Sequence, residues 1–229
     1  MILIHHTMSA QSRFVRLVLG EYDSAHELAD ERPWERRKEF LDVNPAGTLP
    51  VLIAEAGMAI AGHYPILEYL DETRGIMMRE RRLMPEYPLD RAEVRRLIDW
   101  MMIKLDTDVV KPLVRERVFK LEMPAEQGGG APDSRVLRAA RANIRQHMAY
   151  INWLAGTRNW LAGKTPTLAD FAGAASLSVL DYLGEVEWAD APHARDWYGR
   201  VKSRPSFRPV LADKLRGMPP GSHYTDLDF

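Results

Sequence analysis

The chain contains no cysteine among its 229 residues. This absence excludes disulfides, thiolate metal sites and a thiol nucleophile. The sequence also has no apolar run near the roughly 20 residues that a membrane-spanning helix needs. Its first residues, Met1–His6, lack the charged start and the longer apolar core of a signal peptide. We therefore expect a cytoplasmic protein with no membrane partner.

An excess of charge of one sign is likewise missing. Lysine and arginine number 31, and aspartate and glutamate number 32, so no overall field favours nucleic acid as a partner. The histidines are scattered without the spacing of a metal site, so no metal is expected. What the chain does have is a hydrophobic content of 46%. This is enough for the core of one large domain or two modest ones.

The first third of the chain predicts a small mixed sheet. Ile2–Ile4 is an apolar strand, helical spacing follows over Ser12–Gly20, and a second strand is expected at Ala25–Leu28. Two further strands flank a hairpin turn at Gly57, and Pro65 is expected to start a helix. This order predicts a four-stranded mixed sheet with helices on its faces.

The most informative stretch is Asn44–Leu52, with the sequence NPAGTLPVL. Gly47 permits a tight loop, and Pro50 opens the apolar run that enters the sheet. The sequence leaves the isomer of the Leu49–Pro50 bond open. A cis bond would turn the backbone of Leu49 outward, where an extended peptide can pair with it. The alternative is an ordinary strand start in a loop-rich region.

Beyond Leu89 the sequence predicts helices. The charged segment Thr73–Pro88 has no sustained period and is expected to be a linker. A long helix follows, and Pro112 is expected to bend it or end it. Thr167–Asp170 is a capping box that predicts a core helix. From Pro205 the helical spacing is lost.

These patterns divide the chain into two domains. Residues 1–76 form the α/β domain, and residues 88–229 form an all-helical domain with an extended C-terminal tail. The helix that starts at Ser134 has a basic stripe on one face, which is either a solvated surface or a docking surface. The stripe consists of Arg135, Arg138, Arg141 and Arg145.

Two positions in the first domain have both a structural and a functional interpretation. Ser9 precedes a helix, where its hydroxyl either caps the helix or stabilises an anionic thiolate. Trp34 stands among charged residues in ERPWERR, where it either packs on Phe40 or acts as an interface anchor.

A thioredoxin-like module with an NPxGxxP turn, followed by helices that include a T-L-A-D capping box, resembles the cytosolic glutathione S-transferase superfamily. The resemblance implies that the backbone of Leu49, before a cis Pro50, pairs with glutathione, and that Ser9 activates its thiol. Members that bind glutathione have an acid and a serine before the third helix, where this chain has Gly62 and His63. The resemblance thus implies a degenerate glutathione pocket, and glutathione is doubtful as a cofactor.

The cost of this departure can be estimated. Each lost hydrogen bond to a buried charge is worth roughly 1.5–3 kcal/mol, and each 1.4 kcal/mol weakens binding about tenfold. His63 is expected to replace part of the missing contact, or Tyr64 to fill the vacated space.

A narrower resemblance rests on ERPWERR, the degenerate pocket and the C-terminal HYTDLDF. Together they are similar to the FtsZ-binding, glutathione-transferase-like division proteins of alphaproteobacteria, the FzlA group. This implies a non-catalytic homodimer that binds FtsZ filaments at the division site and regulates cell division. The alternative is a Ser-type glutathione transferase that conjugates glutathione to a small electrophile. The expected partner-binding residues are Trp34, Arg36, Arg37, Tyr224, Asp226, Leu227, Asp228 and Phe229.

The tail has a second interpretation. Asp226 and Asp228 alternate with Leu227 and Phe229, so acids and apolar side chains face opposite ways in an extended segment. The tail either binds the partner or folds onto its own body, with its acids meeting the arginine stripe.

Overall fold

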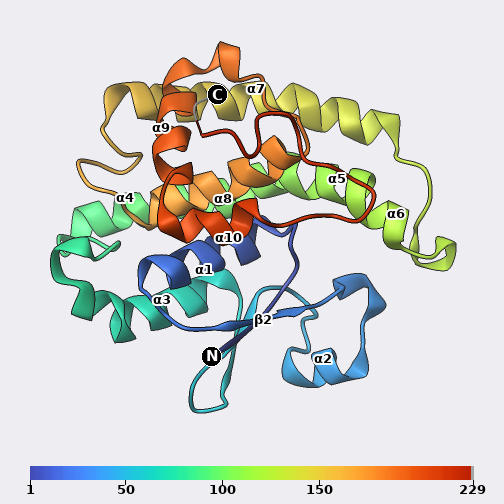
Figure 1. Ribbon diagram of the computed structural model, residues 1–229, viewed down its shortest axis with the longest axis horizontal. Coiled ribbons are helices and arrows are strands. Elements are labelled where there is room, and N and C mark those ends of the chain that lie inside the picture. Colours follow the sequence, from blue (N-terminus) through green and yellow to red (C-terminus); the bar gives the residue numbers. More distant parts are fainter. Residues whose placement is uncertain (228–229) are drawn as a thin grey trace.

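A computed structural model describes residues 1–227 of the chain (Figure 1). The N-terminal domain is built on four strands in the order β2-β1-β3-β4, a mixed sheet in which β1 pairs with β2 in parallel and the other two pairs are antiparallel. The predicted four-stranded sheet is confirmed. The strands are β1 (Ile2–His5), β2 (Glu27–Asp30), β3 (Val51–Ile53) and β4 (Ala59–Ala61).

Three helices accompany the sheet: α1 (Ala10–Glu21), α2 (Lys38–Val43) and α3 (His63–Thr73). Helices α1 and α3 lie between the sheet and the helical domain, whereas α2 lies apart from them (Figure 1). The side chain of Phe40 on α2 forms a small separate core with Leu49 and Val51. Helix α3 begins two residues before Pro65. The start predicted from proline alone was therefore slightly late.

The segment predicted to be a linker is folded. It contains a 3-10 helical stretch, η2 (Gly75–Arg81), which is interrupted at Arg79, where φ is 51°. After it, Leu83 and Met84 are buried in the main core. The segment therefore packs onto the domains as it joins them.

The helical domain begins with one long helix that does not end at Pro112. Helix α4 (Pro88–Asp99) continues through the π-helical turns η3 (Trp100–Val110), then α5 (Lys111–Val114), η4 (Arg115–Phe119) and α6 (Lys120–Glu122). Of the two alternatives predicted for Pro112, a bend or an end of the helix, the end is wrong. In η3 the N–H of Lys111 bonds to the carbonyl of Asp106, five residues back. This wider turn lets the chain pass a residue that has no N–H of its own.

The remaining helices are α7 (Ser134–Thr157), α8 (Leu168–Tyr182), α9 (Pro192–Lys202) and α10 (Arg208–Leu211). Every residue of α8 is buried, and its predicted capping box is confirmed. The Asp170 carboxylate accepts the N–H of Thr167 at 2.8 Å and the indole N–H of Trp197 at 2.9 Å. None of the helices within residues 1–227 is both long and apolar enough to cross a membrane.

The chain after α10 folds back onto the body. It crosses the front of the helical domain toward α5 and returns toward α9 (Figure 1). Tyr224 is fully buried, donates its hydroxyl hydrogen to the Val210 carbonyl at 2.8 Å, and packs edge-on against Tyr182. The tail as far as Tyr224 is therefore part of the folded domain.

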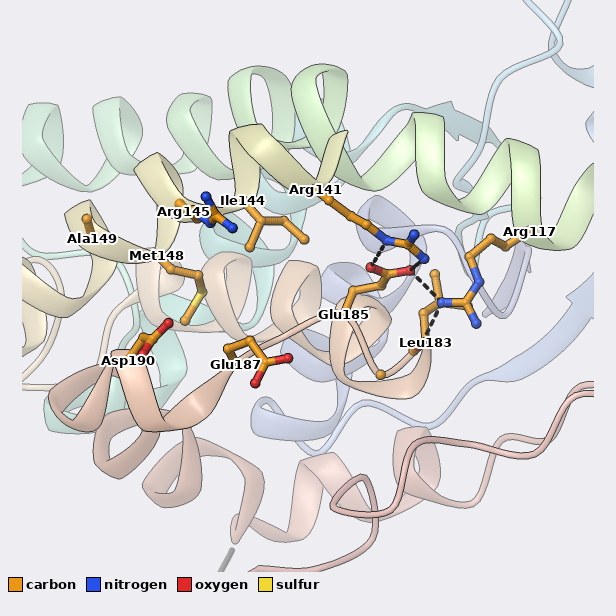
Figure 2. A pocket seen from close by; sticks show the side chains of 11 residues that line it. Arg117, Arg141, Ile144, Arg145, Met148, Ala149, Leu183, Glu185, Glu187 and Asp190 are labelled. Carbon is orange, nitrogen blue, oxygen red and sulfur yellow. Dashed lines mark hydrogen bonds and ion pairs between the residues drawn. The ribbon is translucent and has the colours of Figure 1, made fainter. Parts of the chain in front are cut away.

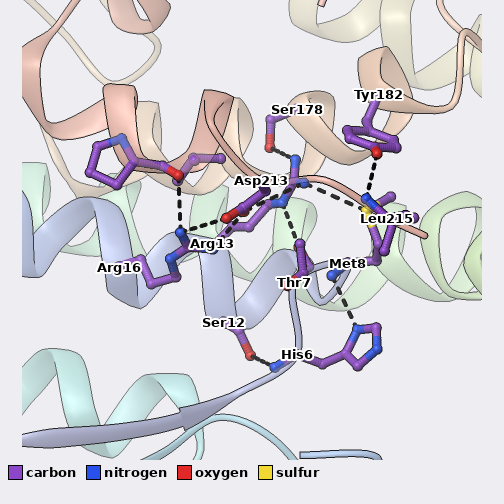
Figure 3. Close-up of polar contacts among 12 residues, drawn as sticks. His6, Thr7, Met8, Ser12, Arg13, Arg16, Ser178, Tyr182, Asp213 and Leu215 are labelled. Atoms are coloured by element: carbon purple, nitrogen blue, oxygen red, sulfur yellow. Dashed lines mark hydrogen bonds and ion pairs between the residues drawn. The ribbon is translucent and has the colours of Figure 1, made fainter. Parts of the chain in front are cut away.

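A buried ionic cluster fixes this tail to α1 (Figure 3). The Asp213 carboxylate accepts two hydrogen bonds from Arg16, at 2.6 and 3.0 Å, and lies 3.9 Å from Arg13. The guanidinium of Arg13 also donates to the Thr7 carbonyl at 2.7 Å and to the Ser178 hydroxyl at 2.9 Å. The cluster therefore joins the first domain, α8 and the tail.

Candidate functional site

The predicted site residues Ser9 and Leu49 line one pocket of about 340 Å³ between the two domains. One wall comes from the loop after β1, the start of α1 and the turn before β3. The other wall comes from η3, α5 and η4. The lining residues are His6, Met8, Ser9, Ala10, Gln11, Pro33, Gly47, Thr48, Leu49, Asp106, Val110, Lys111, Val114 and Phe119.

Ser9 caps α1, as its structural interpretation predicted. Its hydroxyl oxygen accepts the backbone N–H of Ser12 at 3.1 Å and so satisfies one of the free N–H groups at the start of the helix. Ser9 also lines the pocket. The cap leaves its hydroxyl hydrogen available to a ligand, so capping and ligand binding are compatible at this position.

The turn before β3 holds Leu49 at the pocket wall. Gly47 has a φ of 65°, and the Asn44 side chain donates to the Thr48 carbonyl at 2.8 Å. The Leu49–Pro50 peptide bond is cis. Within residues 1–227, the backbone of Leu49 makes no hydrogen bond to another part of the chain. The predicted peptide-pairing edge is therefore present.

The other half of the expected glutathione site is different. Gly62 and His63 do not line the pocket, and burial lowers the pKa of His63 to about 4. This imidazole is neutral at neutral pH and offers no positive charge to a γ-glutamyl carboxylate. Tyr64 donates its hydroxyl hydrogen to Asp99 on α4 at 2.7 Å. Tyr64 therefore does not fill the vacated space, and the expected compensation is absent at both positions.

Two charged residues that line the pocket, Asp106 and Lys111, were not predicted from the sequence. Burial raises the pKa of Asp106 to about 6, and the positive charge of Lys111 opposes this rise. In a regular helix these residues, five apart, lie roughly 140° apart around the axis. The π-type bond between them places Lys111 about one turn after Asp106, so both line the pocket. A search for 3.6-residue periodicity does not find such a pair.

Trp34 joins the two domains, and it does not pack on Phe40. It lies in the 3-10 turn η1 (Pro33–Glu35), half-buried, with its ring centroid 4.6 Å from Phe119 and 5.6 Å from His6. The Phe40 alternative is wrong, because Phe40 packs with Leu49 and Val51 in a separate small core.

The neighbouring arginines have different roles. Arg37 donates to the buried carboxylate of Glu31 at 2.5 Å. Arg36 is exposed and has a φ of 46°. Arg37 therefore supports the local fold, and Arg36 presents its charge to solvent.

The predicted tail residues differ in their exposure to solvent. Tyr224 is buried, whereas Asp226 is exposed and Leu227 is 44% exposed. Asp226 lies near Lys202 and not at the arginine stripe; burial lowers the pKa of Lys202, and the charges of Asp181 and Asp226 oppose that lowering. Asp228 and Phe229 lie outside the described residues. Figure 1 places α2 at the bottom of the molecule, whereas the tail at Leu227 lies beside Gly199 of α9, in the upper part. The described partner-binding residues that are exposed or half-buried therefore form two separate patches, one at Trp34–Arg37 and one at Asp226 and Leu227.

A larger cavity of about 660 Å³ lies on the helical domain, between α7 and the turn after α8 (Figure 2). Arg141 and Arg117 both contact the carboxylate of Glu185, at 2.8 and 2.6 Å, at one end of it. Arg145 lines the middle. The arginine stripe is thus partly an internal ion-pair system and not wholly a solvated face.

An aromatic surface lies where α7 meets the long helix. Tyr150 lies between Trp100 and Trp153, with ring centroids 4.5 and 6.2 Å away. Trp153 is 55% exposed and Ile103 is 53% exposed. We call these four residues the aromatic face. Exposed large apolar groups gathered in one place are typical of protein interfaces.

A mixed sheet with a cis-proline turn, joined to a helical domain across a pocket, defines the glutathione S-transferase class. The model of the glutathione S-transferase N-terminal domain matches residues 8–73, and that of the C-terminal domain matches residues 112–205. The chain belongs to the glutathione S-transferase superfamily.

Among its relatives is FtsZ-localized protein A of Caulobacter vibrioides, which is 43% identical over 230 residues, covering 99% of this chain and 97% of the relative. The structure of FzlA from C. crescentus has a TM-score of 0.90 at 42% identity, covering 100% of this chain and 99% of that one. A crystal structure of a glutathione S-transferase from Sinorhizobium meliloti has a TM-score of 0.98 at 60% identity, with coverage of 100% and 99%.

Proposed function

We propose that this chain is a non-catalytic, glutathione-transferase-like protein that binds FtsZ filaments and regulates bacterial cell division as a homodimer. It acts in the cytoplasm, at the division site. The observation that carries this proposal is the near full-length similarity to FtsZ-localized protein A. The neutral, buried His63 supports the non-catalytic part, because it leaves a γ-glutamyl group without a charged partner.

The two patches identified above are the proposed filament contacts. The first comprises Trp34, Arg36 and Arg37, and the second lies in the tail from Asp226 onward. Two patches on one protomer, doubled in a dimer, allow a single assembly to contact more than one filament subunit. Linking sites in this way raises the effective concentration of the second contact and thus the avidity.

The aromatic face is the proposed surface for self-association. Its two tryptophans are the residue type most enriched at energetic hot spots. Most soluble oligomers are two-fold dimers, in which the same patch of both subunits meets itself. A dimer formed in this way leaves the Trp34 patch free, because Trp34 packs on Phe119 near the end of the long helix, whereas Trp100 and Ile103 lie closer to its start.

Co-sedimentation with FtsZ polymerised in GTP tests the proposal. We expect the wild-type protein to enter the pellet only when filaments are present. Asp226→Lys should abolish this, with an unchanged melting temperature and dimer state. Glu126→Lys, the same charge reversal at an exposed residue in a 3-10 turn of the same domain, is the matched control and should bind normally. If Asp226→Lys instead lowers the melting temperature and still binds filaments, the acid serves the fold and the tail contact is wrong.

A second candidate function is conjugation of glutathione to a small electrophile. It is favoured by Ser9 and the backbone of Leu49 in one pocket, and by the 60% identity to a structure described as a glutathione S-transferase. Calorimetric titration with glutathione separates the two functions. Millimolar or weaker affinity supports the non-catalytic proposal, and micromolar affinity with turnover supports the enzyme.

A further inference from the structure

The pocket between the domains contains a carboxylate that the protein itself does not neutralise. Asp106 is half-buried, and within residues 1–227 its side chain has neither a hydrogen bond nor an ion pair. Carboxylates removed from water in folded proteins are normally paired or hydrogen-bonded, because desolvation of an unpaired charge is costly. This acid is therefore placed to receive a partner from outside the chain.

The backbone around Asp106 is shaped for the same purpose. Its carbonyl accepts the π-type bond from Lys111, and the wider turn keeps both residues on the pocket wall. π-Turns within α-helices are frequent at functional sites, because the irregular turn costs stability. Here the turn also accommodates Pro112, so the sequence fixes this geometry locally.

The surroundings of Asp106 limit the kind of ligand that fits. Across the pocket His6 is neutral, since burial lowers its pKa to about 4. Lys111 is exposed at the rim, and Asp106 is the less exposed of the two charges. The rest of the wall is largely apolar and includes Met8, Val114 and Phe119. The inner part of the pocket thus combines one negative charge with an apolar surface.

We propose that this pocket binds an organic ammonium ion with an apolar body, with Asp106 as its counter-ion. The ammonium group donates hydrogen bonds to the Asp106 carboxylate, and the apolar body packs against Phe119 and the side chains beside it. The volume of about 340 Å³ suits a small ligand of this kind. The proposal is independent of filament binding, and it assigns the pocket a cation in place of an anionic tripeptide.

The test is a titration of the full chain with phenethylamine, followed by the amide NMR signals of Ser9 and Gly47. Phenethyl alcohol and phenylpropionate provide neutral and anionic ligands of similar size. We expect the amine to bind at least about tenfold more tightly than either, as a hydrogen bond between opposite charges predicts. Asp106→Asn should remove this preference. Asp108→Asn is the matched control, because that carboxylate pairs elsewhere, with Lys104 and His147.

Two further measurements keep the proposal falsifiable if Asp106→Asn alters the fold. Lys111→Gln should tighten amine binding, because it removes a repelling charge. Amine affinity should also fall about tenfold from pH 7.5 to pH 5, as the Asp106 carboxylate takes up a proton with a pKa near 6. Burial lowers the pKa of His6 to about 4, so this imidazole stays neutral over the same range, and Lys111 is the other charged group that lines the pocket. Equal or tighter binding of phenylpropionate, or an amine affinity unchanged in a folded Asp106→Asn protein, would overturn the proposal.

Discussion

Replacing Asp213 by asparagine should detach the tail from α1 at a measurable cost in stability. The change leaves two guanidinium groups without their carboxylate. Arg13 is fully buried and Arg16 is 5% exposed. Removing one partner of a buried ion pair typically costs about 3–5 kcal/mol, because the remaining charge is left uncompensated.

The structure narrows this range. Arg13 keeps its bonds to the Thr7 carbonyl and the Ser178 hydroxyl, and Arg16 keeps a bond to the Pro209 carbonyl at 3.2 Å. Asparagine also retains an oxygen that can accept one hydrogen bond. We therefore expect a loss near the lower end, about 3 kcal/mol in the free energy of unfolding.

Urea unfolding followed by circular dichroism measures this loss, and limited proteolysis tests whether cleavage concentrates after Leu211. Asp196→Asn is the matched control, because Asp196 forms an exposed ion pair with Arg195 at 3.1 Å. Exposed pairs contribute little, so the control should change stability by less than about 1 kcal/mol. A loss in Asp213→Asn no larger than in the control would refute the view that this cluster anchors the tail.

Three further predictions concern the pocket and the aromatic face. Ser9→Asn keeps a helix cap and removes the hydroxyl. Because the proposed function does not use glutathione, its affinity should be millimolar or weaker in the wild-type protein and in the variant. A micromolar wild-type affinity that is lost in the variant contradicts this. Trp153→Glu should convert the proposed dimer to a monomer that binds filaments without bundling them, because it places a charge in the proposed apolar interface. Sedimentation velocity measures this against Leu121→Glu, an exposed apolar position on α6, and a dimer that persists would argue against the aromatic face. Asp106→Asn should raise the free energy of unfolding at pH 7.5 and have little effect near pH 4. The ionised carboxylate, with its pKa raised to about 6, costs stability only as the pH rises toward and through that value. Urea unfolding at both pH values measures the change, and an equal gain in the free energy of unfolding at both would contradict this reasoning.

The sequence by itself determined the features whose cause is local. Proline, glycine and short apolar runs specify the turn at Asn44–Leu52 and the strand that follows it. A Thr and an Asp three residues apart specify the start of α8, because the two side chains satisfy N–H groups within the same turn. Ser9 could be recognised as a helix cap for the same reason. The departure from the glutathione-binding pattern was also readable, because the expected acid and hydroxyl before α3 are missing from the sequence itself.

The tertiary structure decided what depends on contacts between distant segments. Pro112 is compatible with an ended helix or a wide turn, and packing of the long helix against α7 and α8 favours the turn that brings Asp106 and Lys111 to one wall. Trp34 packs against Phe119, 85 positions later in the chain, and not against nearby Phe40, because the two domains meet at Trp34. The tail as far as Tyr224 folds onto the domains of its own chain. Its Asp213 forms ion pairs with two buried arginines that only the fold brings together. In each case a distant part of the chain removes a side chain from water, and no local pattern of residues predicts that burial.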